Sequence, residues 1–161
     1  MSIHQDILHS CQQLLALNTL QSKEKKWMLS QNENTAHLNI AHFHILSYLL
    51  KHPSATAKQV SNRLDILPGT LSKWMTQLQR RGLILTTADP KDSRSKHYSL
   101  SPLGTQLAAL YDAMNQQKNA QLKRILEEFD PEQLQTIAKF LSLVGAVEGN
   151  MTYHRVKETQ T

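Results

Sequence analysis

"SATAKQVSNRLDILPGTLSKWMTQLQRRGLI" (residues 54–84) contains two short helical patterns that are joined by a tight turn. The first has an apolar stripe and can be capped by Ser54 or Thr56. The second has apolar residues at i, i+3, i+4 and i+7 and stops at a glycine. The stretch therefore predicts a helix-turn-helix, with a bracing helix at 54–65 and an inserted helix at about 68–81.

The outward face of the second predicted helix is polar and basic. Residues 66–88 contain neither Glu nor Asp, whereas surface helices of helical bundles usually mix Glu with Lys. An α-helix fits the major groove of B-DNA, where its exposed side chains meet base edges. We therefore expect this helix to bind DNA. The candidate contact residues on it are Gly69, Thr70, Ser72, Lys73, Thr76, Gln77 and Arg80.

Three of these residues have chemically distinct expected roles. Lys73 can bind guanine edges or phosphate, and Gln77 can bind adenine through two hydrogen bonds. Gly69 has no side chain, so it permits close approach of the helix backbone to DNA. The hydroxyls on this face can contact either phosphates or bases.

Immediately after the helix-turn-helix, two β-prone segments at 83–88 and 95–100 flank a charged loop. A charged hairpin beside a DNA-binding helix is expected to be a wing that follows the backbone or enters the minor groove. We expect Arg94 to be the inserted or phosphate-clamping side chain and Asp92 to hold a basic side chain in place. Lys91, Lys96 and His97 are further candidate phosphate contacts.

Helical patterns flank this module on both sides. They lie at residues 3–29 (with a break expected near 18–24), at about 102–128 and at 131–147, and they carry Leu-rich stripes that one winged module cannot cover. An uncovered stripe would be a sticky patch, so we expect these helices to pair between two copies of the chain.

The predicted fold class is thus mainly α with a small β-wing: a winged helix-turn-helix flanked by N- and C-terminal dimerisation helices. The expected organisation has four parts. It consists of an N-terminal dimerisation arm (1–36), the DNA-binding module (37–100), the C-terminal dimerisation helices (101–147) and a loosely ordered tail (148–161).

The charge of the chain is concentrated in the middle. The net charge of the 161 residues is +5, with a sequence pI near 9.4. Residues 51–97 hold nine Lys or Arg against three Asp, so this segment carries +6 and the remainder is close to neutral. A basic centre between neutral flanks is typical of nucleic-acid-binding modules, although a basic solvated surface is the alternative interpretation.

Several other classes of protein find no support in the sequence. Cys11 is the only cysteine, so neither an intrachain disulfide nor a Cys-rich zinc site is possible. There is no signal-peptide pattern and no run of about 18 apolar residues, so we expect a cytoplasmic protein without a membrane partner. Phosphate-binding glycine loops and nucleophile motifs are also absent. We therefore expect no enzymatic activity and no cofactor.

The middle of the chain resembles the MarR family of winged helix-turn-helix transcriptional regulators. Three stretches carry the resemblance: "LNIAHFHILSYL" (38–49), the helix-turn-helix at 54–84, and "DPKDSRSKHYSLSPLG" (89–104). The last matches a wing motif D-x-R that is followed by a strand and then by L-[ST]-x-x-G. The resemblance extends over about residues 37–145.

This resemblance implies a homodimer that binds a pseudo-palindromic double-stranded DNA operator, usually as a repressor, and that a small-molecule effector releases. It also implies that Arg94 is the wing arginine, with Asp92 as its partner. Lys73 stands where the family often has Arg. Pro68 stands where the family often has Ser, so the family's contacts at the start of this helix do not carry over directly.

The signal that would control such a protein has several candidates. Trp27, His44, Tyr48 and Tyr111 are candidate residues of an effector pocket, and interface packing is the alternative for them. Zinc sensing by the histidines at positions 37, 42 and 44, or oxidation of Cys11, are two further alternatives. We do not predict a metal site, since two of these histidines lie two residues apart on different faces. A winged-helix module for protein–protein interaction, without specific DNA binding, is the alternative for the whole chain.

Overall fold

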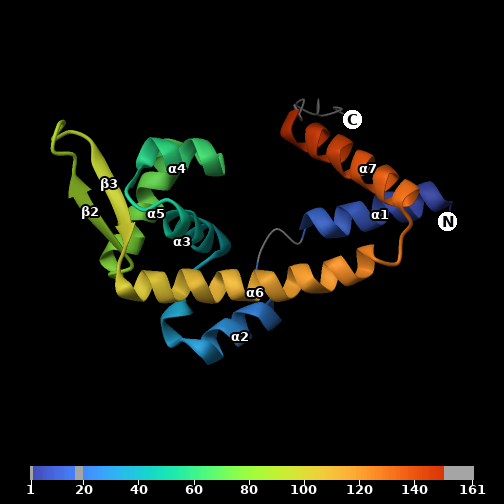
Figure 1. Cartoon of the computed structure of the whole chain (residues 1–161), viewed down its shortest axis with the longest axis horizontal. Helices are drawn as coiled ribbons and strands as arrows, with labels where there is room; N and C mark the ends of the chain where they lie inside the picture. Colours follow the sequence, from blue (N-terminus) through green and yellow to red (C-terminus); the bar gives the residue numbers. More distant parts are fainter. Residues whose placement is uncertain (1, 17–19, 151–161) are drawn as a thin grey trace, which may run out of the picture. The chain divides into compact units, whose positions relative to one another are not determined.

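The computed structural model describes residues 2–16 and 20–150 of the chain (Figure 1). It divides into two units, a first unit through Gln116 and a second unit from Gln117, which are described separately. The elements in chain order are α1 (Ile3–Ala16), α2 (Ser22–Gln31), the 3-10 turn η1 (Glu33–Thr35), α3 (Ile40–Lys51), β1 (Ala55–Thr56), α4 (Ala57–Leu64), α5 (Pro68–Arg80), β2 (Ile84–Ala88), β3 (Lys96–Leu100), α6 (Pro102–Leu126) and α7 (Pro131–Asn150).

The predicted fold class is confirmed: the described chain is mainly helical, with one small antiparallel sheet of order β1-β3-β2. The predicted wing is the β2–β3 pair, in which Ile84 lies opposite Leu100 and Ala88 opposite Lys96. The third strand, β1, was not predicted. It is only two residues long and pairs with β3, and so short a strand has no periodicity that a sequence pattern can show.

The break in the N-terminal helical pattern was predicted near residues 18–24, and residues 17–19 of this region lie outside the described residues. The helical pattern at 3–29 forms two helices, and α2 begins at Ser22. The backbone N–H of Gln21 donates to Glu24 Oε2 at 3.1 Å, as in a capping box, which gives α2 its own start.

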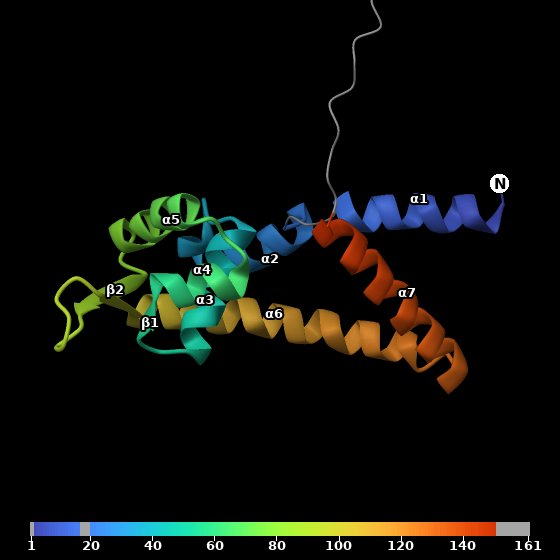
Figure 2. The ribbon, with the colours of Figure 1, turned by 90° about the horizontal axis from the view of Figure 1, so that it is seen from above.

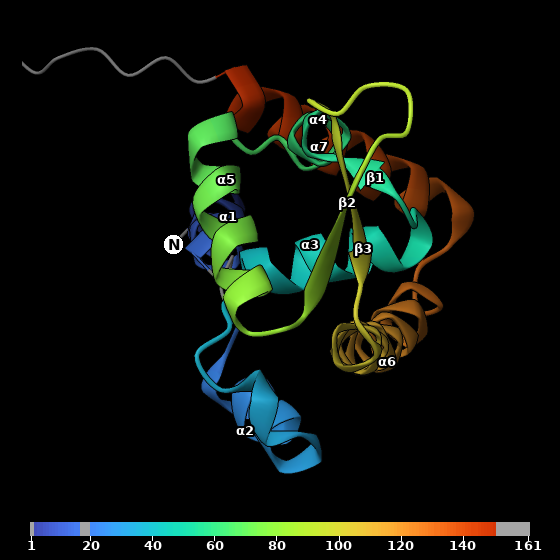
Figure 3. The same cartoon turned by 90° about the vertical axis from the view of Figure 1, so that its left-hand side faces the viewer.

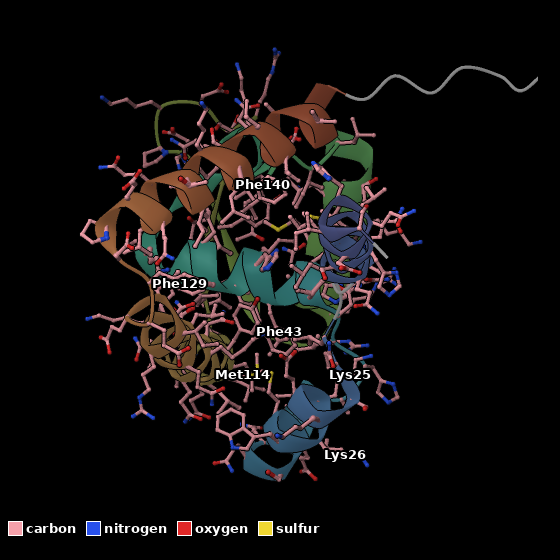
Figure 4. All side chains as sticks on the ribbon, turned by 90° about the vertical axis from the view of Figure 1, so that its right-hand side faces the viewer. Lys25, Lys26, Phe43, Met114, Phe129 and Phe140 are labelled. Carbon is pink, nitrogen blue, oxygen red and sulfur yellow. The ribbon has the colours of Figure 1, made fainter. Side chains whose placement is uncertain are left out.

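The core of the first unit lies between α3, α5 and α6. Its largest fully buried side chains include Phe43, Ile45 and Leu46 of α3, and the Phe43 ring stacks on Tyr111 of α6 at 5.1 Å between centroids. Phe43 and Met114, labelled in Figure 4, both belong to this core. The apolar face of α5 is buried in the same core, so the opposite face of this helix is left at the surface.

The wing and α6 are joined by a tightly packed corner. Ser101 Oγ donates to the Gly82 carbonyl oxygen at 2.6 Å and accepts from the Gly104 N–H at 3.0 Å. The Ser101 N–H also donates to the Leu83 carbonyl oxygen at 3.0 Å. These bonds explain the L-[ST]-x-x-G pattern: the hydroxyl caps α6, and the glycine lets α6 approach the Leu83 backbone.

The second unit comprises the end of α6 and α7. Asp130 caps α7, since its Oδ1 accepts from the Gln133 N–H at 2.9 Å. Helix α7 reaches Asn150, three residues further than predicted, and the rest of the expected tail (151–161) lies outside the described residues. Among the described helices, none is long and apolar enough to cross a membrane.

Candidate nucleic-acid interface

Helix α5 is held by its apolar face and preceded by a tight turn. Leu71, Met75 and Leu78 are buried, and Trp74 is partly buried against the same core. In the turn, Asp65 takes a left-handed conformation with φ of 53°, and Ser61 Oγ donates to the Ile66 carbonyl oxygen at 2.6 Å. Pro68 occupies the first turn of α5, where a backbone N–H would have no partner within the helix, so the lack of one in proline is tolerated. The predicted helix-turn-helix is therefore present, and α5 has its predicted bounds to within one residue. Helix α4 begins three residues later than predicted, at Ala57, because Ala55 and Thr56 form β1.

Six of the seven predicted contact residues on α5 are exposed, and these are Gly69, Thr70, Ser72, Lys73, Thr76 and Arg80. Gln77 is half-buried instead. Thr76 Oγ1 donates to the Ser72 carbonyl oxygen at 2.9 Å, so its methyl group and the hydroxyl lone pairs remain for a ligand. Helix α5 and the β2–β3 hairpin lie at the same end of the first unit (Figure 3).

Gln77 is half-buried because it contacts a residue outside the helix-turn-helix. Its Oε1 lies 2.9 Å from Nε2 of His42, which is on the first turn of α3 and is 4% exposed. Burial lowers the pKa of His42, the hydrogen bond to Gln77 raises it, and the nearby Arg81 charge lowers it. Sequence reasoning missed this pair because nothing local links two polar residues that lie 35 positions apart.

The wing projects beyond α4 and α5 (Figure 2). Its turn is ordered by two carboxylates: Asp89 Oδ1 accepts from the Lys91 N–H at 2.8 Å, and Asp92 Oδ1 accepts from the Arg94 N–H at 3.0 Å. Asp92 thus fixes the backbone of Arg94, whereas the sequence predicted that it would hold a basic side chain. The Lys91, Arg94 and Lys96 side chains are exposed.

The His97 side chain links the wing to Ser54, the residue directly before β1. Its Nδ1 lies 2.8 Å from the Ser54 carbonyl oxygen, and its Nε2 lies 3.1 Å from Asp89 Oδ2. Both ring nitrogens therefore face oxygen acceptors, an arrangement that favours the doubly protonated ring. The hydrogen bond to Ser54, followed by that to Asp89, raises the pKa of His97. The expected role of His97 as a phosphate contact does not fit this geometry, because both nitrogens are already engaged.

The His97 bridge predicts a pH-dependent wing. A histidine pKa that folding raises contributes stability fully below the ordinary value of 6.5, and this contribution is lost as the pH rises through the raised pKa. Asp89, whose pKa is lowered first by the Lys91 N–H and then by His97, stays ionised throughout this window. We expect hydrogen-exchange protection of the Asp89 and Ser95 amides, corrected for intrinsic rates, to fall as the pH rises above about 6.5.

The matched control for this experiment is His97→Gln, whose side chain has no proton to gain or lose in that window. Its wing amides should show no pH-dependent change in corrected protection. Equal pH dependence in the two proteins would contradict the role given to His97.

A hollow of about 500 Å³ lies beside α5, between α4, α5 and β3. Its polar lining includes Lys58 and Asn62 of α4, Ser72 and Gln79 of α5, and Lys96 of β3. Lys58, Asn62 and Gln79 were not among the predicted contacts. A sequence pattern could not place them here, because the hollow forms only where the helix-turn-helix meets the wing.

The candidate effector residues are only partly brought together. His44 and Tyr111 lie with ring centroids 6.0 Å apart, at the contact between α3 and α6. Tyr48 instead stacks on His52 at 4.3 Å, and Trp27 packs, partly buried, against the core. No group of three or more His, Cys, Asp or Glu side chains that could hold a metal ion occurs within residues 2–16 and 20–150.

A helix-turn-helix with an exposed, carboxylate-free second helix and a basic wing defines the class of winged-helix DNA-binding proteins. Residues 38–96 match the model of the MarR family. This match agrees with the resemblance seen in the sequence: residues 38–96 of the chain form a MarR-family domain.

Two bacterial regulators are similar to the chain in sequence. The chain is 24% identical over 153 residues to the uncharacterized HTH-type transcriptional regulator YvnA of Bacillus subtilis, and the match covers 88% of this chain and 95% of YvnA. It is 27% identical over 106 residues to the transcriptional regulator AdcR of Streptococcus pneumoniae, and this match covers 65% and 72%.

Solved structures show the same fold. The adhesin competence repressor AdcR of Streptococcus pyogenes superposes with a TM-score of 0.71 at 20% identity, covering 93% of this chain and all of that one. FabT of Streptococcus pneumoniae, solved in complex with DNA, superposes with a TM-score of 0.67 at 19% identity, covering 92% and 99%.

Proposed function

We propose that this regulator is a homodimeric repressor that binds a pseudo-palindromic DNA operator and is released by a small ligand or another signal. The observation that carries the proposal is the exposed face of α5, which bears Lys73 and Arg80 and no carboxylate, beside a wing with three exposed cations. A relative solved with DNA and a relative described as a repressor support it.

In this proposal, α5 lies in the major groove. Gly69 lets the backbone come close, and Lys73 and Thr76 meet base edges or phosphates. Arg80 and the hydroxyls of Thr70 and Ser72 bind phosphates along the groove.

The wing then contacts the neighbouring backbone. Asp92 accepts a hydrogen bond from the Arg94 backbone N–H and leaves the Arg94 side chain exposed. The side chain can then enter the minor groove or bind a phosphate. Lys91 and Lys96 contact flanking phosphates. Lys96 also lines the hollow beside α5, which gives the DNA backbone a polar, basic channel to follow.

Dimerisation is supported by apolar side chains that one copy leaves exposed. They lie on α1, on the end of α6 and on α7, and include Ile3, Leu8, Leu14, Leu122, Ile125, Leu141, Leu143 and Val147. Soluble proteins cover such patches by association, usually about a two-fold axis. Two winged modules related in this way match half-sites that are ~10 bp apart centre to centre.

For release we propose a small ligand that binds near His44 and Tyr111, where α3 meets α6. Zinc and oxidation of Cys11, which is half-buried in α1, are the two alternatives. ZitR of Lactococcus lactis, a solved relative, is described as zinc-responsive. Titrating the protein–DNA complex with zinc, and separately with oxidant and reductant, distinguishes these signals by the change in DNA affinity.

Replacing Arg94 with alanine tests the wing. We expect weaker binding on every DNA sequence, with the slope of log affinity against log salt reduced by about 1, because one phosphate contact is lost. Fluorescence anisotropy at several salt concentrations measures both quantities. Arg124→Ala, which removes an exposed arginine of the second unit, should change neither, and an unchanged slope for Arg94→Ala would contradict the wing contact.

A further inference from the structure

A chain of two hydrogen bonds joins the start of α3 to the DNA-facing helix α5. The backbone N–H of Asn39 lies 3.1 Å from Nδ1 of His42, and Nε2 of His42 lies 2.9 Å from Oε1 of Gln77. The Asn39 side chain completes the capping box by accepting from the His42 N–H at 3.0 Å. His42 is buried, and its ring packs edge-on against Trp74 with centroids 6.2 Å apart.

The backbone decides which ring nitrogen of His42 carries the proton. A backbone N–H can only donate, so Nδ1, which faces the Asn39 N–H, must be an acceptor without a proton. The neutral ring then carries its proton on Nε2, and Nε2 donates to Gln77. Because a donor faces the Gln77 amide, the atom opposite it must be the oxygen and not the nitrogen.

This assignment fixes the direction of the Gln77 amide. Oε1 points inward to His42, and the NH₂ group is on the other side. Among the described residues, no buried side-chain nitrogen or oxygen lacks a hydrogen-bond partner. The Gln77 NH₂ group has no partner within the described part of the first unit. The NH₂ group therefore reaches the surface beside the exposed face of α5.

We propose that Gln77 is a specificity-determining residue which offers only hydrogen-bond donors to DNA, and that His42 is the positioning residue that turns its amide. This inference rests on the proposed function. The NH₂ group can donate to the acceptors of the major groove, and among these O6 of guanine and O4 of thymine lie where adenine and cytosine carry amino-group donors. A two-bond contact with adenine, which the sequence suggested, needs Oε1 facing outward and is replaced by this donor-only recognition.

The sharpest test reverses the hydrogen-bonding character of residue 77. In Gln77→Glu, one carboxylate oxygen keeps the His42 bond, and the other presents an acceptor where the wild type has a donor. Affinities are measured by anisotropy on duplexes that carry each of the four base pairs at every half-site position. At one position we expect the variant to prefer cytosine or adenine, whose amino groups are donors, where the wild type prefers guanine or thymine. The ratio of the affinities for the two kinds of base should change by about three- to tenfold.

A matched pair of variants tests the positioning role of His42. His42→Asn places an amide oxygen near the site of Nδ1 and keeps an acceptor for the Asn39 N–H, but it cannot reach Gln77. His42→Gln has the reach to restore a donor to Gln77. We expect the first to reduce the discrimination at the Gln77 position to that of Gln77→Ala, and the second to restore it. A residue with only a structural role would alter overall affinity or the melting temperature and leave base discrimination unchanged.

The outcomes separate this inference from the proposed function. If the wild type binds no duplex specifically, the proposed function fails and the inference fails with it. If the wild type is specific but Gln77→Glu keeps its base preference, or if His42→Asn discriminates as the wild type does, the inference alone is overturned.

Discussion

Replacing Gly104 with alanine is expected to lower the free energy of unfolding by about 3 kcal/mol, which is a large part of the stability of a small domain. A Cβ at this position would lie 1.9 Å from the Leu83 carbonyl oxygen and 2.9 Å from its carbon. Both are backbone atoms, so no side-chain rotation relieves the clash. Moving Leu83 would also break its hydrogen bond from the Ser101 N–H and displace the base of the wing.

Urea denaturation without DNA measures the effect, with Gly69→Ala as the matched control. Gly69 lies on the exposed face of α5, and a Cβ there would meet nothing within 4 Å. Alanine at this position should be neutral or should stabilise by up to about 1 kcal/mol through helix propensity. Equal unfolding midpoints for the two variants would show that the corner between the wing and α6 is not as tight as described.

Replacing Leu141 with glutamate is expected to dissociate the proposed dimer. Leu141 lies on α7 and is 59% exposed in the single chain. If a second copy covers it, each copy loses about 1.5–3 kcal/mol of apolar burial and also places a charge in the interface. The two copies together should raise the dimer dissociation constant more than 100-fold, which corresponds to about 3 kcal/mol.

Sedimentation velocity measures the association, and anisotropy on an operator duplex measures its consequence for DNA binding. Gln135→Glu adds the same charge to the polar side of α7, on the stripe that continues through Lys139 and Ser142. It should leave the dimer intact. A Leu141→Glu protein that remains a dimer and binds DNA as tightly as the wild type would contradict the place of α7 in the interface.

The helix-turn-helix and the wing could be predicted because their signals are local. The apolar spacing of Leu71, Met75 and Leu78 fixed the buried face of α5, and the β-prone segments around a charged loop fixed the hairpin. The predicted helices at about 102–128 and 131–147 begin where α6 and α7 begin. Pro102 in the first turn of α6 and the Asp130 cap of α7 are signals that depend on neighbouring residues alone.

The hydrogen bonds that orient side chains and the wing turn at the DNA-binding site could not be predicted in the same way. His42 and Gln77 meet only because α3 packs beside α5, and His97 meets Ser54 only because β1 pairs with β3. Asp92 was correctly linked to Arg94, but its short side chain bonds the nearest backbone N–H in the turn. Tertiary packing decides such pairs, and no periodicity in the sequence reports them.

The most direct test of the account is the selection of bound sequences from a random pool of duplex DNA by the purified wild-type protein. The account predicts enrichment of a motif with two related half-sites in inverted orientation, ~10 bp apart centre to centre. A folded protein that enriches no motif, both with zinc and with reductant present, would contradict sequence-specific DNA recognition by α5 and the wing.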